Sequence, residues 1–182
     1  MNPVMRYSTP AIVLHWLVAL LICAAFPLGV YMHELPLSPD KLKLYSYHKW
    51  IGITVLLLVA LRVSWRLTHV PPPLPASVAA WQRHASALVH GLLYLLMIAI
   101  PLSGWLMSSA KGFQTVWFGV LPLPDLIGKD KALGELLAEV HTILNFTLLA
   151  LVVMHVGAAL QHHLIERQPF LQRMGLGKKE RT

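Results

Sequence analysis

The sequence predicts an all-α membrane protein, a bundle of four transmembrane helices with both termini in the cytoplasm. Hydrophobic residues make up 56% of the 182 residues and charged residues only 13%, whereas about a quarter of a soluble domain is charged. A helix needs roughly 20 apolar residues to cross the hydrocarbon core of a bilayer. Four windows without Asp, Glu, Lys or Arg mark the expected helices, at residues 7–33, 50–61, 85–110 and 140–165.

The first two helices are expected near residues 10–32 and 47–67. Arg6 precedes this apolar run, as a basic residue precedes the apolar region of a signal peptide. The run is too long for a signal peptide and lacks a small-x-small cleavage site, so we expect it to be retained in the mature protein. The second window is short, and its helix must continue through Arg62 with its ends in the headgroup region.

The third and fourth helices are expected near residues 85–108 and 136–163. Before the third, "HVPPPLPAS" (69–77) forms a stiff connection, because proline cannot continue a helix. Between the third and fourth, the aromatic and proline-rich "VWFGVLPLPDL" suits an interfacial cap. Residues 164–182 are expected to be a cytoplasmic tail, and residues 1–182 to form a single domain.

The distribution of charge predicts the orientation. One side of the membrane would carry nine basic and two acidic residues, and the other six of each. The positive-inside rule places the first side, with both termini, in the cytoplasm. The net charge of +7 then indicates contact with anionic lipid, and no nucleic-acid partner is implied. The basic residues of the first side are Arg6, Arg62, Arg66, Arg83, Arg167, Arg173, Lys178, Lys179 and Arg181.

Four of the ten histidines lie in the fourth helix: His162 and His163 at its cytoplasmic end, and two within the membrane. His141 and His155 are fourteen residues apart, so they project from nearly the same face, about 40° apart, and are separated by about 21 Å along the helix axis. Polar side chains inside a membrane usually face the interior of the bundle. The fourth helix therefore offers one inward histidine to each leaflet.

Each of these histidines needs a partner at the same depth. The outer candidates are His48 and, less well placed, His33, and the inner candidates are His15 and then His90. The simplest solution pairs His48 with the outer histidine of the fourth helix and His15 with the inner one. Each pair would hold one iron from both axial faces, as in haem groups that transfer electrons. A single such histidine is more often only a hydrogen-bonding core residue, but four at paired depths favour ligands.

Three basic residues lie near these pairs. Haem propionates are carboxylates and need cationic partners when buried, and Lys49, Arg62 and Arg66 are candidates. For the two arginines, ordinary snorkelling is an equal alternative. Gly52 would let a macrocycle approach the backbone, although close packing of helices is the commoner use of small residues.

Four stretches together resemble the bacterial cytochrome b561 family, which includes the cytochrome b subunits of nickel–iron hydrogenases. The resemblance runs from about Tyr7 to Leu171. It implies a four-helix membrane bundle with two haem b groups, and residue by residue it makes His15, His48, His141 and His155 the axial ligands of the haem iron. The stretches are "IVLHWLVALL", "YHKWIGITVLLLVALRVSWR", "RHASALVHGLLYLLMIAIPLSGWL" and "VHTILNFTLLALVVMHVGAALQHHLIER".

The stand-alone members that this chain resembles oxidise periplasmic superoxide and reduce ubiquinone. The resemblance thus implies an oxidoreductase that moves electrons between the periplasmic side and the quinone pool. Because the outer loops carry no net charge, attraction of superoxide would depend on the placement of single lysines. The alternative is an electron-transfer subunit of a larger dehydrogenase or hydrogenase, with a protein redox partner. A transporter would need intramembrane carboxylates, and the four windows contain none.

We expect the quinone on the cytoplasmic side, near His162. This residue lies seven residues after His155, on the same face and about 10 Å further along the helix. An imidazole there could hydrogen-bond the quinone carbonyl and relay protons. His90 is the next candidate.

Overall fold

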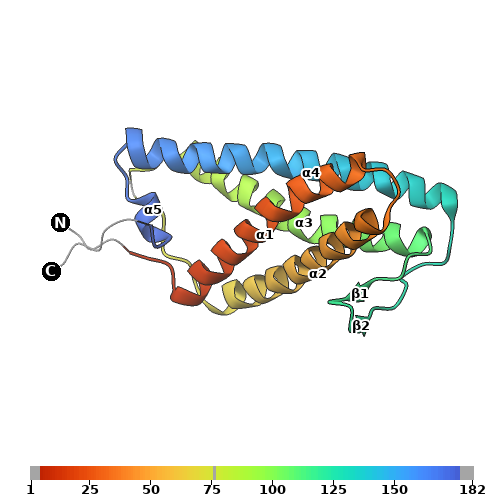
Figure 1. The fold of residues 1–182 in the computed structure, drawn as a ribbon. Helices are drawn as coiled ribbons and strands as arrows, with labels where there is room; N and C mark the ends of the chain where they lie inside the picture. Colours follow the sequence, from red (N-terminus) through yellow and green to blue (C-terminus); the bar gives the residue numbers. More distant parts are fainter. Residues whose placement is uncertain (1–4, 76, 177–182) are drawn as a thin grey trace.

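The computed structural model describes residues 5–75 and 77–176, and most of them are helical. Figure 1 shows the long helices packed into a bundle, with a small sheet at one end and a short helix at the other. Each long helix is long and apolar enough to cross a membrane, which confirms the predicted four-helix membrane fold. The elements are α1 (Thr9–Glu34), α2 (Pro39–Thr68), α3 (Ala80–Ala110), β1 (Val116–Trp117), β2 (Leu121–Pro122), α4 (Lys131–Leu160), η1 (Gln161–Ile165) and α5 (Phe170–Arg173).

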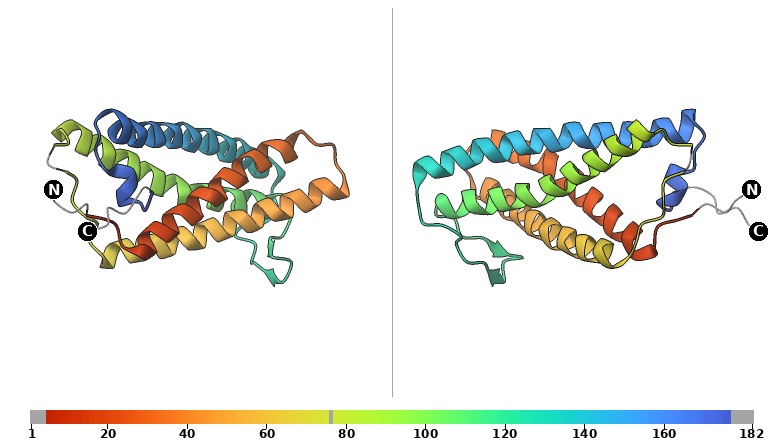
Figure 2. Two further views of the ribbon diagram at one scale, coloured as in Figure 1. Left: turned by 60° about the vertical axis from the view of Figure 1, so that its left-hand side comes forward. Right: turned by 180° about the vertical axis from the view of Figure 1, so that it is seen from behind.

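The bundle has two chemically distinct ends. We call the end where α1 and α3 begin and α5 lies the basic end, and the opposite end, which carries β1 and β2, the hairpin end (Figure 2). That the basic end faces the cytoplasm stays a prediction from charge. Part of that charge, Lys178, Lys179, Glu180 and Arg181, lies outside the described residues.

Helix α2 begins at Pro39 and not near residue 47, because the preceding residues form a helix start. The Ser38 side chain accepts a hydrogen bond from the Lys41 amide at 3.2 Å, Pro39 is the first helical residue, and Asp40 lies in the first turn. All three features favour a helix N-terminus. A window free of charge marks where a helix meets hydrocarbon, so it underestimates a helix that continues into water.

Helices α3 and α4 also begin outside their charge-free windows. The Gln82 side chain accepts a hydrogen bond from the Ala79 amide at 3.0 Å before α3, and the Asp130 side chain accepts one from the Leu133 amide at 3.0 Å at the start of α4. These caps satisfy backbone donors that a helix start leaves unpaired.

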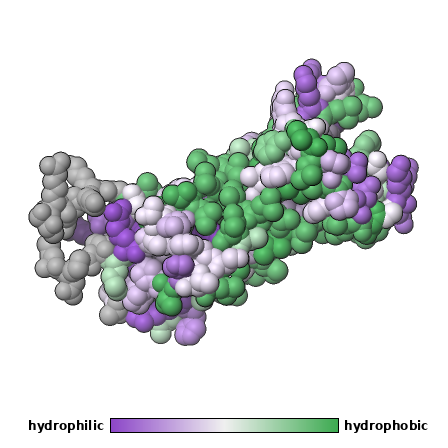
Figure 3. All heavy atoms as spheres, turned by 90° about the horizontal axis from the view of Figure 1, so that it is seen from below, coloured by the Kyte–Doolittle hydropathy of each residue, from purple (hydrophilic) through white to green (hydrophobic). Residues whose placement is uncertain are grey.

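The bundle buries a small apolar core and exposes a wide apolar surface. Figure 3 shows hydrophobic atoms across the middle of the molecule and hydrophilic atoms gathered at both ends. Exposed leucines and valines on the long helices form this surface, and an apolar surface this extensive suits contact with lipid. The core consists of Val18, Val55, Val59, Leu93, Leu96, Met97, Ile100 and Leu148.

Arg173 closes the basic end of the bundle. Its side chain is 4% exposed, and its Nη2 donates hydrogen bonds to the carbonyls of Pro72 at 2.7 Å and Pro73 at 2.8 Å. The Tyr7 amide donates to the Arg173 carbonyl at 3.1 Å, and the Trp16 indole donates to the Met174 carbonyl at 2.9 Å. The expected tail therefore contains a docked helix that joins the start of α1 to the α2–α3 connection.

Replacing Arg173 by Met should lower the free energy of unfolding by about 2 kcal/mol, because it removes hydrogen bonds made by a charged donor. It should also speed hydrogen exchange in residues 168–176. Equilibrium unfolding and hydrogen exchange in detergent micelles would measure both effects. Arg167→Met changes an exposed arginine of the same segment and serves as the matched control. Equal stability of the two variants would contradict the role given to Arg173.

Candidate functional site: two histidine pairs

The first histidine pair lies toward the hairpin end. His48 comes from α2 and His141 from α4, and their ring centroids are 6.3 Å apart with an angle of 81° between the ring planes. The sequence predicted that these two residues lie at the same depth in the membrane, and the structure brings them together.

The second pair lies toward the basic end. His15 of α1 and His155 of α4 have ring centroids 6.3 Å apart and an interplanar angle of 65°. The ring of His90, on α3, also lies near His155, at a centroid distance of 5.1 Å. The Nδ1 atom of His90 is 3.2 Å from the Ser86 hydroxyl. Three histidines therefore gather near the basic end, with His155 in contact with both others.

The separation of the rings in each pair suits one metal ion between two imidazoles. A ring nitrogen binds a metal at about 2.0 Å, and the ring centre lies about 1 Å behind that nitrogen, so opposed imidazoles on one ion have centres about 6 Å apart. The two 6.3 Å pairs match this value. The 5.1 Å contact between His90 and His155 is too short for it.

Neither pair forms a complete metal site from side chains alone. Among residues 5–75 and 77–176, no group of three or more His, Cys, Asp or Glu side chains could hold a metal ion. Two opposed imidazoles instead suit a metal ion whose other ligands are supplied by a cofactor. A haem meets this requirement, because the porphyrin supplies four nitrogens and the protein supplies the axial ligands.

The Nδ1 atoms of the proposed ligands differ in their partners. His141 Nδ1 lies 3.1 Å from the Ile100 carbonyl, which can only accept, so this nitrogen carries the hydrogen. The same Nδ1 is 2.9 Å from the buried Ser103 hydroxyl, which itself donates to Ile100. This arrangement leaves Nε2 of His141 free to bind a metal. In the described chain, His15 and His48 each have a buried Nδ1 with no hydrogen-bond partner, so they lack the support that Ile100 and Ser103 give to His141.

Two glycines make room for the imidazoles of the pair at the hairpin end. A Cβ atom added to Gly29 of α1 would lie 3.1 Å from Cε1 of His48, and one added to Gly104 of α3 would lie 3.1 Å from Cε1 of His141. Each histidine thus packs against a glycine of the preceding helix in the chain. Gly52, which the sequence favoured for a close approach, has no described heavy atom within 4 Å of such a Cβ.

The three predicted basic residues occupy different environments. Lys49 Nζ donates a hydrogen bond to the Phe113 carbonyl at 3.0 Å. Arg62 and Arg66 both lie over the ring of Tyr94, at 5.3 and 5.7 Å from its centroid. Arg62 also interacts electrostatically with both rings of the pair near the basic end, so it is the best placed of the three to meet an anionic group there.

His162 lies in a polar cluster at the end of α4. Its Nδ1 is 2.7 Å from a carboxylate oxygen of Glu166, and that oxygen also accepts from the Gln168 amide group at 3.2 Å. The imidazole stacks on the Phe170 ring, with centroids 4.7 Å apart. The helix changes to π-helical hydrogen bonding at Gln161, a change that is frequent at functional sites. The sequence pointed to the histidine but not to its acidic partner.

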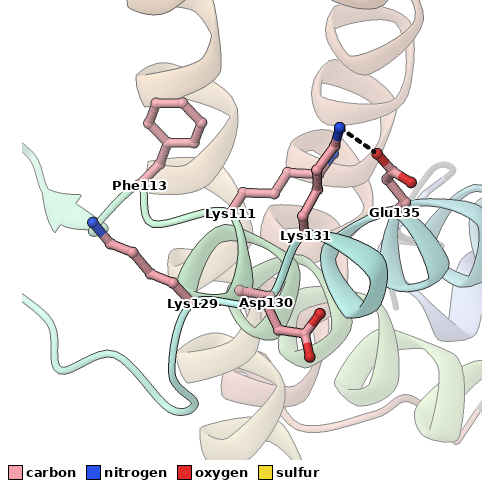
Figure 4. A pocket seen from close by; sticks show the side chains of 7 residues that line it. Lys111, Phe113, Lys129, Asp130, Lys131 and Glu135 are labelled. Carbon is pink, nitrogen blue, oxygen red and sulfur yellow. Dashed lines mark ion pairs between the residues drawn. The ribbon is translucent and has the colours of Figure 1, made fainter.

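A separate pocket of about 440 Å³ lies at the hairpin end, and no histidine lines it. Lys131 and Glu135 form an ion pair at 3.9 Å on one side, while Lys129 lies on the opposite side (Figure 4). The pocket brings three lysines together at the end of the bundle nearest the first histidine pair. Its lining residues are Ala110, Lys111, Phe113, Lys129, Asp130, Lys131 and Glu135.

Comparison with known proteins relates the whole chain to one group of membrane cytochromes. The family described as prokaryotic cytochrome b561 matches residues 6–177. The chain is 36% identical to "Cytochrome b561 homolog 2" of Escherichia coli (strain K12), over 95% of this chain and 92% of that protein. It is 30% identical to "Cytochrome b561 homolog 1" of the same organism, over 93% and 96%. It is 28% identical to "Probable superoxide oxidase CybB" of Yersinia pestis, over 93% and 95%.

The glycine contacts lead to a test within one helix. Replacing an exposed or uncrowded helical glycine by alanine should stabilise a helix by about 0.5–1 kcal/mol. Gly91→Ala, which meets no described atom within 4 Å, should show this gain in unfolding experiments in detergent. Gly104→Ala should lose the gain or be destabilising, because its methyl group would press on His141. Equal stabilisation by the two substitutions would show that His141 is not confined by Gly104.

Proposed function

Because this chain belongs to the prokaryotic cytochrome b561 family, whose members are membrane electron-transfer proteins that bind haem b, we propose that it holds two haem b groups and passes electrons from the periplasmic side to ubiquinone. The observation that carries this proposal is the presence of two histidine pairs, one toward each end of the bundle, with the ring separation that axial ligation requires. The membrane would be the bacterial inner membrane, with the basic end in the cytoplasm.

The axial ligands in this proposal are His48 and His141 for one haem, and His15 and His155 for the other. When bound, each haem would supply one-electron redox chemistry. All four imidazoles must be neutral to bind iron. Ser103 and the Ile100 carbonyl support this role for His141, because they hold the hydrogen on Nδ1. If each pair holds an iron in this way, oxygen and superoxide would have no open site on the metal.

The cationic partners of the haem propionates would be Lys49 and Arg62, with Arg66 beside the latter. Lys49 follows His48 directly and uses one of its three donor hydrogens on Phe113, so the remaining two can bind a carboxylate. Arg62 already interacts with the rings of His15 and His155. A guanidinium at this position would offset the negative charge of a propionate in a poorly hydrated site.

Superoxide is the proposed electron donor, on the basis of the similarity to the Yersinia protein. Two superoxide ions become two molecules of oxygen and release two electrons. With two protons, these electrons convert one ubiquinone to ubiquinol. Superoxide is an anion, and the pocket at the hairpin end is lined by three lysines and two carboxylates, a small local excess of positive charge on a side whose total charge is zero.

Ubiquinone would be reduced at the basic end, near His162. The reaction consumes two protons, and the hydrogen bond between His162 and Glu166 supports a route for them. Glu166 orients the imidazole through Nδ1, which leaves Nε2 to hydrogen-bond a quinone oxygen and pass a proton to it. His90, in contact with His155, is the next candidate for a quinone contact.

The ligand assignment predicts two haem b per chain in a pyridine haemochrome assay. His48→Ala and His141→Ala should each remove the same haem, and His15→Ala and His155→Ala the other, each time halving the haem content. His90→Ala serves as the control and should retain both. If His90→Ala loses a haem while His15→Ala does not, the assignment of His15 as a ligand near the basic end is wrong.

The quinone assignment predicts that His162→Leu and Glu166→Gln keep both haems but slow the oxidation of reduced protein by a ubiquinone analogue. A loss of proton relay should reduce this rate about tenfold or more, measured by stopped-flow absorbance. His163→Leu changes the neighbouring histidine, which donates to the Gln168 carbonyl at 3.2 Å, and should leave the rate unchanged. A wild-type rate for His162→Leu would remove this residue from the site and leave His90.

A further inference from the structure

A short β-hairpin, residues 116–122, interrupts the connection between α3 and α4. β1 and β2 are antiparallel, with Trp117 opposite Leu121, and the two central residues of the turn, Phe118 and Gly119, have φ angles of 50° and 72°. A turn of this kind usually carries glycine or asparagine at both positions. Here a phenylalanine occupies one of them, with its ring exposed.

The hairpin is attached to one level of α2. The Trp50 indole donates a hydrogen bond to the Val116 carbonyl at 2.7 Å, and the Trp117 indole donates to the Thr54 hydroxyl at 3.3 Å. Trp50 lies eleven residues after the start of α2, about 16 Å along the helix, and Thr54 lies about 6 Å further. The hairpin therefore lies beside α2, several turns in from the start of that helix (Figure 2).

This level coincides with the change from polar to apolar sequence in α2. Residues 39–49 include one acidic and three basic residues, whereas residues 50–61 include none. The residues that hold the hairpin are thus in the first turns of the apolar segment. A bilayer places its boundary between headgroups and hydrocarbon at such a transition.

The side chains of the hairpin suit that boundary. Val120 is 83% exposed, and Phe118 and Leu121 are exposed as well. The Phe118 ring packs against Trp50 and Trp117, with centroids 5.4 and 5.0 Å away. Tryptophan and other aromatic residues are enriched where a membrane meets water.

We propose that the hairpin is a lateral membrane anchor, in which Phe118, Val120 and Leu121 insert between phospholipids of the leaflet at the hairpin end. The apolar surface of the hairpin continues the lipid-facing surface of the bundle at the same depth, which favours lipid over a soluble protein as its partner. Because the hairpin accepts a hydrogen bond from Trp50, two residues after His48, its contact with lipid also fixes the position of the first histidine pair relative to the membrane surface.

A nitroxide spin label attached at single cysteines tests the proposal. Cys23 is exposed and is first replaced by serine, after which Val120→Cys, Leu37→Cys and Leu57→Cys are made separately. Leu37 is 84% exposed between α1 and α2 and serves as the aqueous control, while Leu57 is 47% exposed in the apolar segment of α2 and serves as the lipid control. Each labelled protein is reconstituted into phosphatidylcholine–phosphatidylglycerol vesicles.

Power-saturation electron paramagnetic resonance then compares collisions of each label with oxygen, which concentrates in lipid, and with a water-soluble nickel chelate. The label at residue 120 should collide more with oxygen than with nickel, as at residue 57, and the label at residue 37 should show the reverse. A label at residue 120 that behaves like the one at residue 37 would place the tip in water and overturn the proposal. Low collision with both reagents would also overturn it, because another protein surface would then cover the tip.

Discussion

The pairing of imidazoles across an apolar bundle is the constraint on which the rest of the structure depends. A histidine buried among membrane helices has two nitrogens that neither lipid nor aliphatic side chains can satisfy. Here each proposed ligand faces a histidine of another helix, and α4 takes part in both pairs through His141 and His155. The helices must therefore approach closely at two depths, and glycines on α1 and α3 permit this at one of them. The wide apolar outer surface and the small core follow from a bundle that encloses polar groups and faces lipid.

The sequence was sufficient to predict the four helices and the depth of each histidine, because both depend on spacing along one chain. Charge-free windows located the spans, and a separation of fourteen residues placed His141 and His155 on one face in opposite leaflets. Depth alone did not distinguish His15 from His90 as the partner of His155. That distinction depends on the rotation and crossing of helices, which set one ring separation at 6.3 Å and the other at 5.1 Å.

Contacts between helices, and contacts within the segments that connect them, could not be predicted because they also depend on how the helices are rotated and crossed. Ser103 resembles any small polar residue of a membrane helix until the structure places it beside His141. The β-hairpin has strands of two residues each, one of them ending in Pro122, which is too short and too rich in proline for an alternating pattern to indicate a strand. The cluster of His162, Glu166 and Gln168 depends on a π-helical turn that α-helical spacing does not describe.

The position of Arg173 also sets an order for assembly during synthesis. Arg173 binds the Pro72 carbonyl, 101 positions earlier in the chain, and the carbonyl of the neighbouring Met174 binds Trp16, 158 positions earlier. Because the ribosome makes the chain from its N-terminus, α1 and the α2–α3 connection are made before α5 and can enter the membrane first. Closure of the basic end therefore follows the insertion of these segments, and a chain truncated before Arg173 would lack the hydrogen bonds that fasten this end.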